Sequence, residues 1–132
     1  MTARVDSPPA SRAVTAAAVA DVLAVLVFAI VGRRSHAEAL DPAGVLATAA
    51  PFLLGLLVGW LAARAWRLPV GRRTGLVVWL GSAVVGLAAR AVVTHRLPLT
   101  FVFIATVSLA VLVLGWRAVV LTVLRARRRR LS

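Results

Sequence analysis

Cysteine and lysine are both absent from the sequence, and acidic residues are scarce. A sequence without cysteine cannot form a disulfide, a zinc–thiolate site or a cysteine-ligated iron–sulfur cluster. The only acids are Asp6, Asp21, Glu38 and Asp41, against 16 arginines, and the formal net charge is +12. So few charges, nearly all of one sign, cannot cover the surface of a soluble domain.

Hydrophobic residues, in contrast, make up 61% of the chain. A soluble domain has about 45–50% even when glycine is counted. The excess apolar surface must face lipid, so the sequence predicts an integral membrane protein. The arginines gather where apolar runs end and no aromatic residues interleave with them, so we expect no nucleic-acid partner despite the charge.

Four apolar runs are each long enough to cross a bilayer. The first contains the 19 residues from Ala13 to Val31, and at ~1.5 Å per residue it spans ~30 Å of hydrocarbon. The others cover about residues 45–63, 74–93 and 99–124. We predict an all-α fold, a four-helix transmembrane bundle over residues 13–124, with an N-terminal arm (1–12) and a basic tail (125–132). A cleaved signal peptide is the alternative for the first run, because Ala37-Glu38-Ala39 resembles a processing site.

Prolines and small residues add detail to these helices. Pro98 suits the first turn of the fourth helix, and Pro51 either starts the second helix or kinks it. Stripes of small residues at a spacing of four predict close packing, either within the chain or between protomers. They are Gly55, Gly59 and Ala63 on the second helix, and Ser82, Gly86 and Arg90 on the third.

The distribution of arginine predicts the orientation. Eleven arginines lie in the arm, the middle loop and the tail, and only three lie on the other side (Arg33, Arg34 and Arg96). By the positive-inside rule, both termini are cytoplasmic and the chain is a multi-pass protein of the plasma membrane. Trp60, Trp66, Trp79 and Trp116 all fall toward the cytoplasmic ends, where we expect them to anchor the bundle at the interface.

Asp21 is the most informative residue. It lies nine positions beyond Arg12, which places a carboxylate ~13 Å inside the membrane. Arg117 lies ~12 Å from the same face, because it precedes Arg125 by eight positions. Opposite charge and matched depth predict an intramembrane ion pair. Two alternatives remain: Arg117 snorkels while a protonated Asp21 bonds a hydroxyl such as that of Thr122, or Asp21 binds a proton or a substrate.

Two further groups of cations are candidates for binding. The outer polar cluster, Arg33, Ser35, His36 and Arg90, could hold an anion; the alternative for Arg90 is that it complements the C-terminus of its helix. The tail is a lipid-binding candidate, because basic residues beside a membrane helix attract anionic lipid. Its arginines are Arg125, Arg127, Arg128, Arg129 and Arg130.

Motifs for chemistry are lacking. His36 and His95 lie beyond the helix ends, whereas a haem inside a bundle needs histidines on facing helices, so we expect no haem or other cofactor. Two histidines without clustered carboxylates also predict no metal site. No nucleophile with a histidine and a carboxylate and no phosphate-binding glycine loop is visible, so we expect no enzyme.

The order of short motifs resembles a known family. Asp21, Phe28 with Gly32 to His36, Pro51-Phe52, Gly59-Trp60, Gly86 with Arg90, and Gly115-Trp116-Arg117 are similar to the domain of unknown function 3054 family. The resemblance covers the chain from Asp21 to Arg117. It implies a small prokaryotic membrane protein, mostly actinobacterial or haloarchaeal, and it implies no activity.

Two classes of function remain open. A non-enzymatic scaffold or accessory subunit would use the Asp21–Arg117 pair to fix helix register. A small transporter or channel for a proton, an anion or an amphiphile would move its substrate past Asp21, Arg117 and the outer arginines. In either case the expected partners are membrane lipids, anionic at the cytoplasmic face, and a second copy or another membrane protein.

Overall fold

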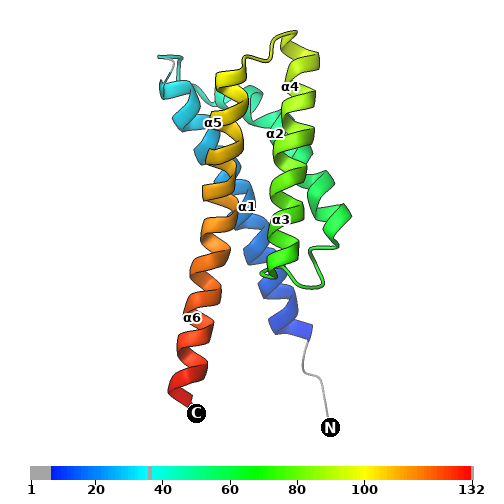
Figure 1. The fold of residues 1–132 in the computed structure, drawn as a ribbon, viewed down its shortest axis with the longest axis vertical. Helices are drawn as coiled ribbons and strands as arrows, with labels where there is room; N and C mark the ends of the chain where they lie inside the picture. Colours follow the sequence, from blue (N-terminus) through cyan, green and yellow to red (C-terminus); the bar gives the residue numbers. More distant parts are fainter. Residues whose placement is uncertain (1–6, 36, 132) are drawn as a thin grey trace.

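The computed structural model describes residues 7–35 and 37–131, with side chains from Ser11 onward. These residues form an all-α bundle of four spans, each long and apolar enough to cross a membrane (Figure 1). The first two spans are single helices, α1 (Ser7–Ser35) and α2 (Pro42–Ala63). The third span joins α3 (Arg72–Leu80), the π-helical turn η1 (Gly81–Val85) and α4 (Gly86–Thr94). The fourth joins α5 (Leu99–Leu109), the π-helical turn η2 (Ala110–Leu114) and α6 (Gly115–Leu131).

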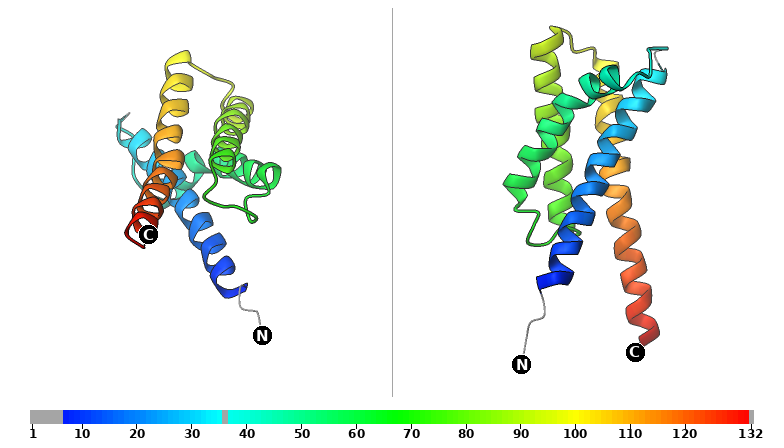
Figure 2. Two further views of the ribbon diagram at one scale, coloured as in Figure 1. Left: turned by 60° about the horizontal axis from the view of Figure 1, so that its bottom comes forward. Right: turned by 180° about the vertical axis from the view of Figure 1, so that it is seen from behind.

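The two ends of the bundle differ in what they carry. The end of α6, the loop between α2 and α3 and the described start of α1 are all directed toward the same end of the bundle, the lower end in Figure 1, and we call this the tail end. The turn between α1 and α2 and the link between α4 and α5 lie at the opposite end, as Figure 2 shows from behind. The predicted four-helix bundle is therefore confirmed.

The helices differ from the expected runs mainly at their ends. α1 already begins at Ser7, and α6 continues to Leu131, so most of the expected tail extends the last helix. α2 begins at Pro42 because the carboxylate of Asp41 caps it, accepting the N–H of Gly44 at 3.0 Å. Pro51 consequently lies inside the helix and does not start it. Pro98 is the N-cap of α5 and lies just before its first turn.

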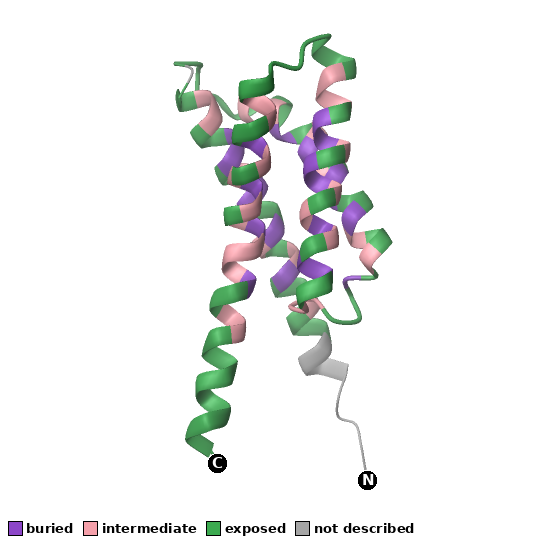
Figure 3. Cartoon of the chain, in the orientation of Figure 1, coloured by how far each residue is buried: buried purple, intermediate pink, exposed green. Residues whose placement is uncertain are grey.

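Apolar side chains face both inward and outward. Val25, Phe52, Val78, Leu109 and Val113 are fully buried where the four spans meet. Figure 3 shows that this buried region is narrow and that the outer faces are exposed along the whole bundle. Large apolar side chains lie on those faces in every span, as Leu23, Leu57, Val84 and Val111 illustrate. Apolar faces of this extent are what a lipid environment covers, so the chain is a multi-pass membrane protein.

The glycine stripes pack against one another within the chain. A Cβ placed on Gly55 would lie 2.6 Å from the carbonyl oxygen of Gly81, and one on Gly81 would lie 2.6 Å from the Cα of Gly59. A Cβ on Gly59 would meet the Cα of Val78 at 2.9 Å. Glycine is therefore required here because the backbones of α2 and the third span touch. We call this contact the glycine seam.

Candidate functional site

The carboxylate of Asp21 lies in the interior of the bundle. Ala17, Asp21, Ala24 and Phe28 recur at intervals of three or four residues and form the buried face of α1. Asp21 is the one acid on that face, and its side chain is fully buried. A carboxylate so far from water requires partners that replace its hydration.

Arg117 of α6 binds this carboxylate through both terminal nitrogens of its guanidinium. Its Nη1 lies 2.7 Å from Oδ1 of Asp21, and its Nη2 lies 2.7 Å from Oδ2. The side chain of Arg117 is only 3% exposed, so water does not compete for the contact. Two parallel charge-assisted bonds of this kind fix both distance and orientation. The structure therefore brings together the two residues that the sequence paired by depth.

Two tryptophans complete the coordination of Asp21. The indole N–H of Trp60, on α2, donates to Oδ2 at 2.8 Å, and that of Trp116, on α6, donates to Oδ1 at 2.9 Å. Each carboxylate oxygen thus accepts two hydrogen bonds. We call Asp21, Arg117, Trp60 and Trp116 the buried polar network. It connects α1, α2 and α6 through hydrogen bonds to the carboxylate of Asp21.

Arg117 connects this network to the rest of the bundle. Its Nε donates to the carbonyl of Pro69, in the loop between α2 and α3, at 2.9 Å. Its Nη1 also donates to the carbonyl of Val113, in η2, at 3.1 Å. The stem of the side chain passes over Gly75 of α3, where a Cβ would lie 3.0 Å from Cδ of Arg117. Every span, and the loop at the tail end, therefore touches the network.

The sequence did not identify the tryptophans as part of the site. They were expected at the interface, but Trp60 and Trp116 donate inward to Asp21, and Trp79 donates to the carbonyl of Thr106 at 3.0 Å. Only Trp66, which is 47% exposed, lies mainly on the surface. The depth shared by Trp60, Trp116 and Asp21 was a signal that could have linked them.

Thr122 is not the partner of Asp21. Its hydroxyl donates to the carbonyl of Ala118, one turn earlier in α6, at 2.8 Å. Thr122 is also exposed, whereas Asp21 is buried. The alternative in which Arg117 snorkels to the surface while Asp21 bonds Thr122 is therefore not the arrangement observed.

The outer polar cluster does not gather into one site. Arg33 bonds the carbonyl of Ala39 at 2.7 Å and the hydroxyl of Thr48 at 3.0 Å, and it pairs with Glu38 at 3.3 Å. Ser35 donates to the carbonyl of Val31 at 2.8 Å, and the guanidinium of Arg90 lies 4.4 Å from the centre of the Phe101 ring. Among the residues that the structure describes, these three side chains do not bond one another. His36 lies outside the described residues.

The tail arginines lie on the last turns of α6. Arg125 and Arg127 to Arg130 are exposed on a helix that projects from the bundle at the tail end (Figure 3). Arg127 to Arg130 lie at least ten positions beyond Arg117 along α6, whereas Arg125 is about two turns from it. The chain thus carries a neutralised pair inside the bundle and a concentrated positive charge outside it.

Comparison with known proteins gives one match. A family model described as "Protein of unknown function (DUF3054)" matches residues 18–120, which include all four members of the buried polar network. No curated protein and no solved structure matches the chain. The predicted resemblance is confirmed over most of the chain, and the comparison supplies no activity.

Proposed function

Because the chain belongs to the DUF3054 family of proteins of unknown function, we propose a function from the geometry at Asp21. The protein is a non-enzymatic membrane bundle that serves as a scaffold or accessory subunit. The observation that carries this proposal is that both oxygens of a fully buried carboxylate are occupied by four donors from two helices. An ionised carboxylate only accepts hydrogen bonds, so a substrate could bind Asp21 only after at least one of these four donors withdrew.

The energetic character of the pair agrees with a structural role. Removing two charges from water is expensive, so a buried pair contributes less to overall stability than to selecting one arrangement of helices. At Asp21 the wrong register would leave Arg117 or the carboxylate without a partner in low dielectric. A scaffold that presents a fixed surface to a partner benefits from this selection.

We propose that both termini lie in the cytoplasm and that the membrane is the plasma membrane. Arg64, Arg67, Arg72 and Arg73 lie at the same end of the bundle as the arginines of α6, in support of this orientation (Figure 1). Reporter fusions after Ser132 and between Pro69 and Arg72 should report a cytoplasmic location, and a fusion beside Asp41 an external one. A cytoplasmic signal at Asp41 would reverse the orientation.

The scaffold role is tested by flux and stability in parallel. Wild-type protein and Asp21→Asn are reconstituted in vesicles that contain a pH-sensitive dye and, separately, a chloride-sensitive dye. We expect neither protein to raise flux above that of protein-free vesicles, and we expect Asp21→Asn to melt at a lower temperature in detergent. Purification from the native membrane in mild detergent should also yield a partner in fixed stoichiometry with the wild-type chain.

A small transporter is the second candidate, and the two π-helical turns favour it. Such turns are frequent at functional sites, and η2 contributes the carbonyl of Val113 to Arg117. Transport through this site would require Arg117 to release Asp21 during the cycle. Proton or anion flux that Asp21→Asn abolishes without changing the melting temperature would establish this candidate and exclude the scaffold.

A further inference from the structure

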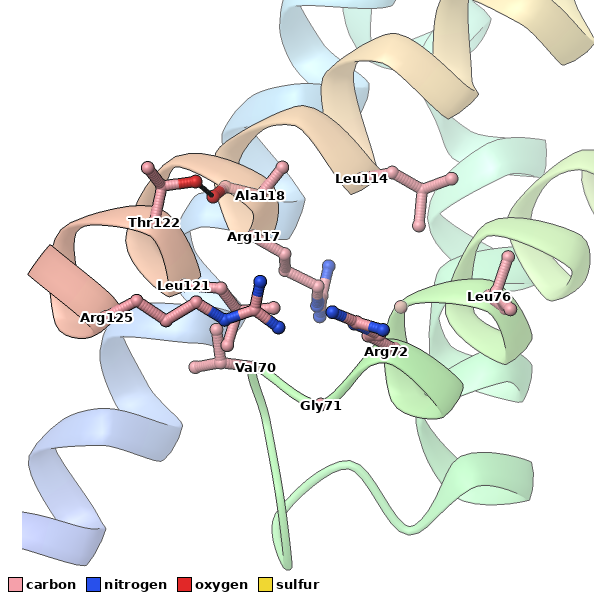
Figure 4. Close-up of a pocket in the computed structure, with 11 residues that line it drawn as sticks. Val70, Gly71, Arg72, Leu76, Leu114, Arg117, Ala118, Leu121, Thr122 and Arg125 are labelled. Carbon is pink, nitrogen blue, oxygen red and sulfur yellow. Dashed lines mark hydrogen bonds between the residues drawn. The ribbon is translucent and has the colours of Figure 1, made fainter.

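A groove at the tail end lies between α3, α6 and the loop that precedes α3. It has a volume of about 380 Å³ (Figure 4). Its floor includes the stem of Arg117, whose charge is already matched by Asp21. Among the described residues, no acid pairs with the two remaining cations on its lining, Arg72 and Arg125.

Arg72 and Arg125 form a cationic rim. Figure 4 shows that Arg125 extends from α6 toward α3 and that the guanidinium groups of Arg125 and Arg72 lie on either side of that of Arg117. Both are exposed. Within residues 7–35 and 37–131, neither guanidinium makes a hydrogen bond or an ion pair. Two like charges held in this way attract an anion between them.

The backbone at the same place also favours an anion. Gly71 is the N-cap of α3, it lines the groove, and it supplies no side chain to cap the first N–H groups of the helix. The third span continues from there for 23 residues, so the positive end of its dipole lies at the groove. This feature adds to the attraction of the two arginines.

The lining next to the two arginines on the same helices is mainly apolar, and we call it the apolar wall. It is formed by Leu76 of α3 and by Leu114, Ala118 and Leu121 of the fourth span. Leu76 is 48% exposed, on a helix that we assign to the membrane. Arg72 is the first residue of its span, whereas Leu76 and Leu114 lie deeper, so the groove is cationic at the membrane surface and apolar below it.

We propose that this groove binds one anionic phospholipid, with its phosphate between Arg72 and Arg125 and an acyl chain along Leu76, Leu114 and Leu121. The charge of the rim and the polarity gradient along the groove match a lipid of this class. A free anion would contact the rim but would make no favourable contact with the apolar wall. The site uses Arg125 alone among the tail arginines, it does not include Arg127 to Arg130, and it does not depend on the scaffold role.

Native mass spectrometry of the full chain tests the site with defined lipids. The probes are phosphatidylglycerol, phosphatidylcholine and inorganic phosphate, at an ionic strength near 0.15 M so that charges more than ~8 Å away are screened. Wild-type protein should retain one phosphatidylglycerol in preference to phosphatidylcholine. The double variant Arg72→Gln/Arg125→Gln should lose about 30-fold in affinity, which corresponds to about 2 kcal/mol for two arginines.

The tail supplies a charge-matched control. Arg128→Gln/Arg130→Gln removes the same charge from the same helix and should weaken the binding of this one lipid by no more than about threefold, because screening limits its reach. Equal losses in the two double variants would overturn the proposal, since the binding would then follow net charge alone.

A second pair of variants tests the apolar wall. Ala118→Phe fills the groove from an exposed position and should reduce retention of phosphatidylglycerol, whereas Ala88→Phe, on an exposed position of α4, should not. Inorganic phosphate should not displace the lipid at millimolar concentration. If phosphate displaces it and Ala118→Phe has no effect, the rim is a site for a free anion and the lipid proposal is wrong.

The wild-type chain gives a check that needs no variant. Phosphatidylglycerol with a photoreactive group on its acyl chain should label two tryptic peptides, residues 74–90 and residues 118–125, because the groove lies between them. Labelling confined to other peptides would contradict the proposal even if the arginine variants failed to fold.

Discussion

Along the glycine seam between α2 and the third span, backbone meets backbone, whereas α1 and the fourth span are joined by long polar side chains. In the seam, Gly55, Gly59 and Gly81 approach so closely that a Cβ would overlap the opposite chain. Around Asp21 and Arg117, the contact is a pair of 2.7 Å charge-assisted bonds in the interior. Both halves of the bundle are tight, but for different physical reasons.

The glycine seam and the buried polar network respond differently when the helices are displaced. A gap of about 0.5–1 Å already removes about a quarter to a half of a van der Waals contact, but such a contact is tolerant of polarity and needs no partner of opposite charge. The buried polar network makes a demand of another kind, because a charge without its partner is costly wherever in the interior it lies. We therefore infer that the seam sets the distance between spans and that the network sets their register.

The largest expected effect comes from breaking the network at one partner. Asp21→Asn or Arg117→Leu leaves the other residue uncompensated, which in buried settings costs about 3–5 kcal/mol and somewhat less where lipid and water defects give relief. Melting temperatures of both variants in one detergent should fall well below that of the wild-type protein.

Exchange of the two charges is the control. Asp21→Arg with Arg117→Asp restores opposite charges at the same place and should recover part of the loss, although the surrounding tryptophans no longer fit. If the two single losses add in the exchanged protein, Asp21 and Arg117 do not meet in solution and the proposed register mechanism fails.

Disruption of the glycine seam should have a smaller effect. In Gly81→Ala the new methyl group would lie 2.6 Å from the Cα of Gly59, so the two spans must separate. Overpacking of this kind costs about 1–3 kcal/mol. Gly115→Ala is the matched control, because a Cβ at Gly115 has nothing within 4 Å, and it should leave the melting temperature unchanged or slightly raised. A similar loss in both variants would show that the close contact in the seam is not responsible, because a Cβ at Gly115 meets nothing and alanine is the better helix former.

Loss of one indole donor should have a still smaller effect. Trp60→Phe keeps an aromatic ring, although a smaller one, and removes the indole N–H whose nitrogen lies 2.8 Å from Oδ2 of Asp21. Hydrogen bonds between membrane helices average about 0.6 kcal/mol and reach about 1.7. Trp66→Phe, at an exposed ring, should cause no measurable change in melting temperature. An equal response of the two would remove Trp60 from the network.

The sequence predicted the fold and the ion pair because each depends on one strong physical quantity. Hydrophobic length determines the four spans, and the cost of an intramembrane charge requires a partner for Asp21 at the same depth. The tryptophans were assigned to the interface because that preference holds for an isolated indole and does not account for an acid on another helix that accepts its N–H. The π-helical turn η1 was also not predictable from the sequence. It begins at Gly81, a residue of the glycine seam that lies outside the stripe of small residues counted in steps of four from Ser82.

The outer cluster shows a further limit of such reasoning. Arg33, Ser35 and Arg90 were grouped because all lie near the same membrane face, but depth does not specify position around the bundle. Glu38 and Asp41, in the turn just after α1, lie close enough in sequence to pair with Arg33 at 3.3 Å and 4.0 Å. A short connection brings such partners together at little entropic cost, whereas Arg90 lies on another span.

The smallest effect on stability should come from the tail, which takes part in neither the seam nor the network. Replacement of Arg127, Arg128 and Arg130 with glutamine removes exposed charge and leaves every contact inside the bundle in place. The melting temperature in neutral detergent should therefore not change, because exposed charges contribute little to folding. Binding to vesicles that contain anionic lipid should weaken and should depend less on salt, since each exposed arginine near such a surface adds to an attraction that ions screen. A fall in melting temperature would instead make the last turns of α6 a structural part of the bundle, and the division of the molecule into a seam, a network and an electrostatic tail would then be incorrect.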